Sequence, residues 1–206
     1  MPNDDEILDD PQLLEPEGYV EKGVFDGTDL RDVDASGSRI IDSEFRGANL
    51  SGMDLGSARL MDCTFESVSA DTLDAASGSW LDVTVRASRL GGIQAYSGDW
   101  SRVTFRGVKI DYLNLRDARL SEVVFEDCVI GELDLSSVRA SVVSFPGTRI
   151  DQLTTNATQF KSVDLSGARL SALTGLAGLK GTTISAEQLH DLSASFAAHL
   201  GISVAS

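Results

Sequence analysis

Residues 39–60 read RIIDSEFRGANLSGMDLGSARL, and an apolar side chain stands at every fifth position of this stretch. The same interval extends from Val20 to Leu170, with Thr155 as the single polar exception. We call the residues at this interval the central residues. A helix repeats every 3.6 residues and a strand every two, so neither can bury every fifth side chain on one face. A fixed internal period instead indicates a coiled repeat architecture in which each unit packs on its neighbour.

A second, longer period lies on top of the first, because similar side chains recur at every fourth central residue. The clearest column contains Phe25, Phe45, Phe65, Val85, Phe105, Phe125, Phe145 and Leu165. Similar side chains stack on one another from turn to turn if one turn of the coil has four sides, each with its own central residue. The sequence therefore predicts a coil with a square cross-section.

The residues two positions before the central residues complete the predicted interior. Gly78 and Gly98 stand beside Trp80 and Trp100, so a small side chain accompanies each of the largest ones. Because protein interiors are close-packed, this compensation of volume indicates that both positions point inward. We therefore expect the two tryptophans to be core residues and not an exposed stacking surface.

Short motifs within this region resemble the A(D/N)LXX signature of the pentapeptide-repeat family. They are Ala48-Asn49-Leu50-Ser51-Gly52, Ala58-Arg59-Leu60, Ala118-Arg119-Leu120 and Ala168-Arg169-Leu170. The resemblance covers about residues 18–174. It implies an all-β fold, a right-handed quadrilateral parallel β-helix with the central residues and those two before them inside. At ~4.8 Å per turn, nearly eight turns would make a rod roughly 37 Å long.

The chain divides into three predicted regions: an acidic N-terminal tail or cap at 1–17, the β-helix at 18–174, and a C-terminal capping or dimerisation helix with its tail at 175–206. Residues 1–17 contain seven Asp or Glu and no Lys or Arg. This composition is typical of a flexible tail. The pairs Ile7-Leu8 and Leu13-Leu14 fit the alternative that the segment folds over the first turn as a cap.

The C-terminal region contains a clear helix. Ser185 and Gln188 form a predicted capping box, Ile184 and Leu189 a hydrophobic staple, and Gly201 marks the end. The apolar stripe of the helix contains Leu189, Leu192, Phe196 and Leu200. The stripe can cover the end of its own rod, pair with a second chain, or do both. Because family members of the mycobacterial gyrase-protecting type dimerise through a C-terminal helical segment, the resemblance implies a homodimer.

Composition excludes several classes of protein. The formal net charge of −15 disfavours direct binding of nucleic acid and attachment to anionic membranes. No stretch approaches the ~18 apolar residues of a membrane span, and no secretory signal is visible. Cys63 and Cys128 occupy inward positions ~15 Å apart along the axis, too far for a disulfide. We therefore expect a cytoplasmic protein.

No residues suggest catalysis, a metal site or a cofactor. The histidines His190 and His199 are nine positions apart, which is not the spacing of a helical zinc pair. The repeat region has no histidine, so its serines and aspartates lack a general base. We expect a protein that is not an enzyme.

Two functional hypotheses remain. The first is a rigid rod that serves as a protein–protein interaction module for an unknown partner. Its candidate acidic face contains Asp34, Asp54, Asp74 and Asp134, although such columns are also expected on a solvated, charge-balanced surface.

The second hypothesis follows from the family resemblance: a DNA mimic that binds DNA gyrase or topoisomerase and modulates quinolone sensitivity. Charge density weakens it, because ~37 Å of B-DNA carries about 22 negative charges. Here residues 1–17 contribute −7 of the total of −15, which leaves −8 for the rest of the chain.

Overall fold

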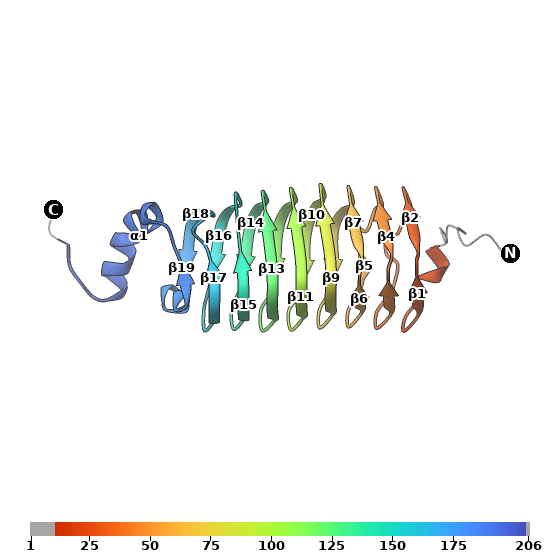
Figure 1. The fold of residues 1–206 in the computed structure, drawn as a ribbon, viewed down its shortest axis with the longest axis horizontal. Helices are drawn as coiled ribbons and strands as arrows, with labels where there is room; N and C mark the ends of the chain where they lie inside the picture. The colour runs from red at the N-terminus through yellow and green to blue at the C-terminus, as the bar shows by residue number, and fades with distance from the viewer. Residues whose placement is uncertain (1–10, 205–206) are drawn as a thin grey trace.

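The computed structural model describes residues 11–204, which form a parallel β-solenoid of about eight turns followed by one α-helix. Figure 1 shows the turns stacked along the long axis, with β1 near one end of the rod and α1 at the other. The predicted β-helix fold is confirmed.

Within the described residues, one sheet contains twelve strands. They are β1 (Tyr19–Glu21), β2 (Val24–Asp26), β3 (Arg39–Ile41), β4 (Glu44–Arg46), β6 (Arg59–Met61), β7 (Thr64–Glu66), β9 (Ser79–Arg86), β11 (Asp99–Arg106), β13 (Arg119–Glu126), β15 (Arg139–Ser144), β17 (Gln159–Asp164) and β19 (Thr182–Thr183). All pairs are parallel, and Trp80 lies opposite Trp100. Each central residue thus pairs with the fourth one after it, which confirms the predicted length of one turn.

The described residues also form a second sheet of seven strands, which runs along the rod. Its strands are β5 (Met53–Asp54), β8 (Ser69–Asp74), β10 (Arg89–Gln94), β12 (Lys109–Asn114), β14 (Val129–Asp134), β16 (Arg149–Thr154) and β18 (Arg169–Thr174). The remaining elements are η1 (Pro11–Leu13), η2 (Leu176–Leu179) and α1 (Ala186–His199).

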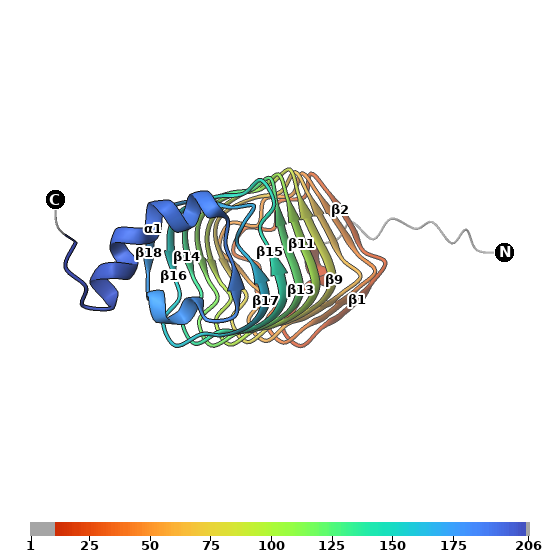
Figure 2. The ribbon, with the colours of Figure 1, turned by 60° about the vertical axis from the view of Figure 1, so that its left-hand side comes forward.

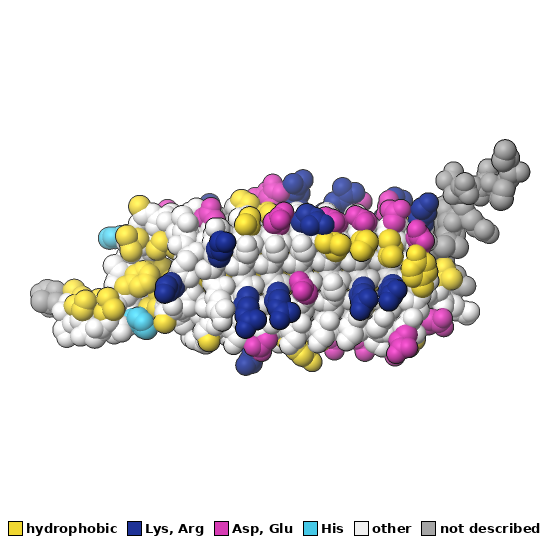
Figure 3. All heavy atoms as spheres, turned by 60° about the horizontal axis from the view of Figure 1, so that its bottom comes forward, with side chains coloured by type: hydrophobic (Ala, Val, Ile, Leu, Met, Phe, Trp, Pro, Cys, Tyr) yellow, Lys and Arg dark blue, Asp and Glu magenta, His cyan; other side chains and the backbone are white. Residues whose placement is uncertain are grey.

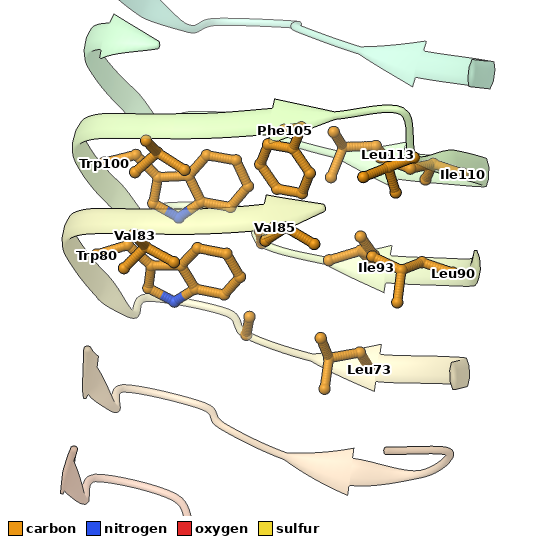
Figure 4. Packing of buried hydrophobic residues seen from close by; sticks show 14 of the residues in the cluster. Leu73, Trp80, Val83, Val85, Leu90, Ile93, Trp100, Phe105, Ile110 and Leu113 are labelled. Carbon is orange, nitrogen blue, oxygen red and sulfur yellow. The ribbon is translucent and has the colours of Figure 1, made fainter. Parts of the chain in front are cut away.

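The interior is filled as the sequence predicts. Trp80 and Trp100 are buried and stack with ring centroids 4.7 Å apart (Figure 4). Trp80 also lies 6.3 Å from Phe65 and 6.5 Å from Phe105. The tryptophan thus bridges the two runs of stacked phenylalanines at the point where Val85 interrupts them. The aromatic rings form a continuous ladder inside the coil.

The polar exception in the central positions, Thr155, is also buried. Its hydroxyl lies 3.2 Å from the carbonyl oxygen of Thr174 and 2.9 Å from that of Gly175. The regular coil ends there, and Gly175 adopts a left-handed conformation with a φ of 87°. The threonine therefore supplies a hydrogen-bond donor to backbone carbonyls that a full further turn would have covered.

The corners of the coil use left-handed backbone. Many residues two positions after a central residue have positive φ, as at Asp62 (54°) and Ser97 (57°), although those within the seven-stranded sheet, such as Tyr112, do not. Gly, Asn, Asp and Ser tolerate this conformation better than other residues. Val142 is an unfavourable occupant, because it is β-branched, has a φ of 58° and is 55% exposed.

The N-terminal end of the rod is covered by part of the acidic segment. Leu14 is buried in the core, and Leu13 packs against it from η1. Both leucines belong to the segment 1–17, for which the sequence leaves a tail and a cap open. The pair Ile7-Leu8 lies outside the described residues.

Candidate functional site

The helix α1 begins as the sequence predicts. The backbone N–H of Gln188 donates to the hydroxyl of Ser185 over 3.1 Å, and the backbone N–H of Ser185 donates to the side-chain oxygen of Gln188 over 2.8 Å. The predicted capping box is confirmed. Gly201 follows the helix with a φ of 71°, as expected for a residue that ends one.

Gln188 has a second role that the motif alone does not reveal. Its side-chain nitrogen donates to the carbonyl oxygens of Leu165 and Ala168 over 2.7 and 2.8 Å, and the residue is buried. Buried carbonyl groups need such partners. The first turn of α1 therefore seals the C-terminal end of its own rod.

The apolar stripe of α1 is covered only in part within the described chain. Leu189 is 53% exposed and Leu200 is 70% exposed, whereas Leu192 and Phe196 are half-buried. The stripe continues in the exposed Ile202 and Val204 after the helix. The described chain thus caps its own end with the first helical turn and leaves most of the stripe open.

A cleft of about 820 Å³ separates α1 from the last turn of the coil. It is lined by β18 on one side and by helix residues such as Asp191, Leu192 and Ser195 on the other. Strand β17 pairs with β19, whereas β18 is the last strand of its sheet. Figure 2 shows α1 and η2 at this end of the rod. The open edge of β18 and the open stripe of α1 therefore lie at the same end of the molecule.

The predicted acidic face is only partly continuous. Strand pairing stacks Asp34, Asp54 and Asp74 on successive turns. Gln94 and Asn114 occupy the next two turns and separate these residues from Asp134; the nitrogen of Asn114 donates to the side-chain oxygen of Gln94 over 2.8 Å. The four aspartates therefore form a group of three and one distant residue.

Each of these aspartates also has a structural role. A carboxylate oxygen of Asp54 accepts the backbone N–H of Gly56 over 2.7 Å, and the other three accept the N–H two residues ahead over 2.9–3.0 Å. The hydrogen bond from Ser36 holds the pKa of Asp34 below its usual range. The column therefore stabilises the corners of the coil whether or not a partner binds it.

Ion pairs join many of the charged side chains on the remaining surface. Within residues 11–204, eight of them are formed: Arg31–Asp29, Arg46–Glu44, Arg86–Glu66, Arg102–Asp82, Arg106–Glu126, Lys109–Asp111, Arg116–Asp134 and Arg149–Asp151. In the pair Arg102–Asp82, two hydrogen bonds of 2.6 Å join the guanidinium to the carboxylate. The guanidinium holds the pKa of Asp82 below its usual range.

The histidines and cysteines of the described residues lie apart from one another, on α1 and inside the coil. No group of three His, Cys, Asp or Glu residues within 11–204 is arranged to hold a metal ion. His190 and His199 are both exposed on α1. Burial raises the pKa of the Cys63 thiol to about 11, which makes it a poor nucleophile. No helix in this part of the chain is long and apolar enough to cross a membrane.

Sequence reasoning missed two features of these surfaces. It identified Gln188 as a capping residue but not as the donor to the last coil carbonyls. It also treated the aspartate column only as charge. A signal for the second was present, because each aspartate precedes by two positions a small residue at a corner, as in Asp54 and Gly56, a spacing typical of Asx turns.

Comparison with known proteins gives one match at the level of sequence families. Residues 28–66 match the model described as Pentapeptide repeats, with eight copies. A search of curated proteins finds no match.

Solved structures provide further matches at low identity. HetL, a pentapeptide repeat protein involved in heterocyst differentiation regulation from the cyanobacterium Nostoc sp. strain PCC 7120, is 15% identical; the match covers 81% of this chain and 89% of HetL, with a TM-score of 0.39. Full-length QnrB1, a plasmid-mediated fluoroquinolone resistance protein, is 16% identical; the match covers 87% of this chain and 99% of QnrB1, with a TM-score of 0.35.

Proposed function

Because this chain is a pentapeptide-repeat protein, we propose that it is a non-enzymatic, rigid interaction rod that forms a homodimer through α1 and binds a protein partner with its faces. The observation that carries the proposal is the open apolar stripe of α1. The coil buries its central side chains almost completely, whereas Leu189 and Leu200 remain more than half exposed.

A second copy of the chain is the natural cover for this stripe. Burying an apolar side chain of this size contributes roughly 1.5–3 kcal/mol relative to leaving it exposed. In a two-fold dimer the same patch serves on both chains, so the gain from each residue counts twice. The first turn of α1 is fixed on the coil by Gln188, which presents the stripe in a constant orientation.

Molecular mass in solution tests the dimer. The wild type should have twice the chain mass of 21.9 kDa in light scattering, and Leu192→Asp with Phe196→Asp should give a monomer with an unchanged β-sheet spectrum. Ser193→Asp is the matched control, because Ser193 is exposed on the same helix. A wild type that is monomeric at all accessible concentrations would contradict the dimer.

We further propose that the acidic face, Asp34, Asp54, Asp74 and Asp134, contributes to binding of a basic protein partner. Asparagine keeps the acceptor that the corner needs and removes the charge. Asp54→Asn with Asp74→Asn should therefore preserve stability and weaken partner binding. Affinity capture from the native cell, followed by titration of the captured protein against both forms, tests this. Equal affinity would exclude the face.

A DNA mimic directed at gyrase is the second candidate, favoured by the acidity of the chain. The eight ion pairs count against it, because each places a positive charge beside a carboxylate, where DNA would present only phosphates. A supercoiling assay with and without a quinolone distinguishes the two. The interaction-rod proposal expects neither inhibition nor protection at micromolar protein, and either effect would favour the mimic.

We also propose a cytoplasmic location. The support is that Cys63 and Cys128 are buried free thiols, and unpaired cysteines are typical of reducing compartments. Cell fractionation with an antibody against the chain would test it.

A further inference from the structure

A column of basic residues on the twelve-stranded sheet has no ion-pair partner within residues 11–204. Strand pairing stacks Tyr19, Arg39, Arg59, Ser79, Asp99, Arg119, Arg139 and Gln159 in this order. Its four arginines are exposed, and none takes part in the eight ion pairs. Figure 3 shows a dark blue row interrupted by one magenta group. Arg39 and Arg59 are in register on neighbouring turns, whereas Arg119 is in register with Asp99. Stacked positive charges without a carboxylate in the same column position attract an anionic ligand.

A row of apolar side chains distinguishes the N-terminal half of this face. Strand pairing places Ile41, Met61 and Leu81 on successive turns, followed by Ser101, Ser121 and Ser141. Met61 is 39% exposed, and its two neighbours are half-buried. In Figure 3 a yellow row runs parallel to the dark blue one over the N-terminal half. We call Arg39, Arg59, Ile41, Met61 and Leu81 the amphipathic patch.

The chain itself contains a segment of matching chemistry outside the described residues. Residues 4–10 read DDEILDD, so five acidic residues surround the pair Ile7-Leu8, with no basic residue among them. The patch offers two arginines beside three apolar side chains. Charge and apolar content are therefore complementary.

The segment can reach the patch. The described chain begins at Pro11, eight residues before Tyr19, which heads the column. At ~3.3 Å per residue, residues 4–10 extend up to about 23 Å from Pro11. Arg39 and Arg59 lie one and two turns beyond Tyr19, about 5 and 10 Å along the axis, whereas Arg119 lies five turns beyond it, about 24 Å. The segment can therefore cover the near arginines and at most touch the far pair.

We propose that residues 4–10 dock on the amphipathic patch of the same chain. The acidic side chains lie over Arg39 and Arg59, and Ile7-Leu8 lies against the apolar row. Asp42 and Asp62 come directly after Ile41 and Met61 in the sequence, so they flank the apolar row opposite the arginines. Their charge repels the acidic segment and keeps the segment on the arginine side of the row. Because the segment is tethered, its effective concentration at the patch is on the order of millimolar. A partner that uses this face must displace it.

A spin label on Asn3→Cys tests the contact in the full-length chain, because the native cysteines are buried and do not compete for the label. In about 10 mM salt, where the Debye length is about 30 Å, the label should broaden the amide signals of Arg39, Arg59 and Met61. It should leave those of Arg119 and Arg139 sharp. In about 1 M salt, where the Debye length is about 3 Å, most of the broadening should disappear.

Charge reversal provides the decisive comparison. Arg39→Glu with Arg59→Glu should reduce the broadening roughly fivefold or more, since it replaces attraction by repulsion. The matched control, Arg119→Glu with Arg139→Glu, changes the net charge equally and should leave the broadening unchanged. Equal effects of the two double variants, or no broadening in the parent, would overturn the proposal. Broadening that appears only after mixing labelled chains with unlabelled ¹⁵N chains would assign the contact to a second copy and also overturn it.

Discussion

The coil and the C-terminal helix contain the same kinds of apolar side chain but expose them very differently. Phe105 in the coil is 0% exposed, whereas Leu200 after the helix is 70% exposed. In the coil, each turn is covered by identical turns above and below, so a repeat supplies its own packing partner. Beyond its first turn the helix is covered only in part, with Leu192 and Phe196 half-buried. Part of its apolar stripe, including Leu189 and Leu200, therefore stays exposed within the described chain.

The largest effect is expected when the same charge is placed in the coil and in the helix, which tests whether the two regions differ in burial. Phe105→Asp buries a carboxylate in the aromatic ladder and should lower the free energy of unfolding by about 4 kcal/mol or more. Phe196→Asp, the matched change in α1, should leave the unfolding of the coil almost unchanged. Urea titrations followed by far-ultraviolet circular dichroism measure both. Similar losses in the two variants would show that the helix is part of the same core.

A change at the junction of the two regions should have an intermediate effect. Gln188→Ala removes the two hydrogen bonds to the carbonyls of Leu165 and Ala168, and also the side-chain acceptor of the Ser185 N–H. We expect a loss of about 2–3 kcal/mol, confined to the C-terminal end. Faster hydrogen exchange at the amide of Leu165 reports it, with Glu187→Ala as the exposed neighbouring control. Unchanged exchange at Leu165 would mean that α1 does not seal the rod.

A third change should stabilise the coil without touching its core. Val142→Asn replaces a β-branched residue at a φ of 58° by one that tolerates this conformation. We expect a gain of roughly 1 kcal/mol, because the valine is more than half exposed and loses little burial. Val124→Asn, in the strand β13, should instead lower stability. Thermal unfolding of both variants measures the difference, and a loss in Val142→Asn would argue against strain at the corner.

The smallest expected effect concerns the surface of the coil. The pKa of Asp82 is lowered by Arg102, so the pair stabilises the folded state above the unfolded pKa of the carboxyl. This contribution is lost as pH falls through the lower folded pKa. Asp82→Asn should therefore lower the Tm slightly at neutral pH and not at all at strongly acidic pH. A difference that stays constant down to strongly acidic pH would assign it to packing.

The coil could be predicted because its determinants are local and repeated. The apolar character of each central residue predicts its burial. The glycines Gly78 and Gly98 beside Trp80 and Trp100 indicate which side chains share a layer of the interior. Even the polar exception follows the rule, since Thr155 is buried like the other central residues. What the period could not reveal is why a threonine stands there. The answer depends on where the coil ends.

The ends were predicted less completely for the same reason. The capping box of Ser185 and Gln188 is a local signal, but the two coil carbonyls that Gln188 reaches belong to the preceding turn, far away in sequence. The exposure of Leu189 depends on how the helix leaves the coil, which no local pattern encodes. The left-handed backbone at Val142 was not predicted, because the five-residue period identifies inward positions and gives no information on the φ angle at a corner.

The fixed register between successive turns has a consequence for how such a molecule can change its length. A deletion of one residue would shift every later turn out of register, so that its inward side chains would move to a corner or to the surface. A duplication of one complete turn would leave all of them in place and add one layer of ~4.8 Å. Growth and shrinkage are thus confined to whole layers. A partner that binds two sites along the rod would therefore find the distance between them changed only by whole layers.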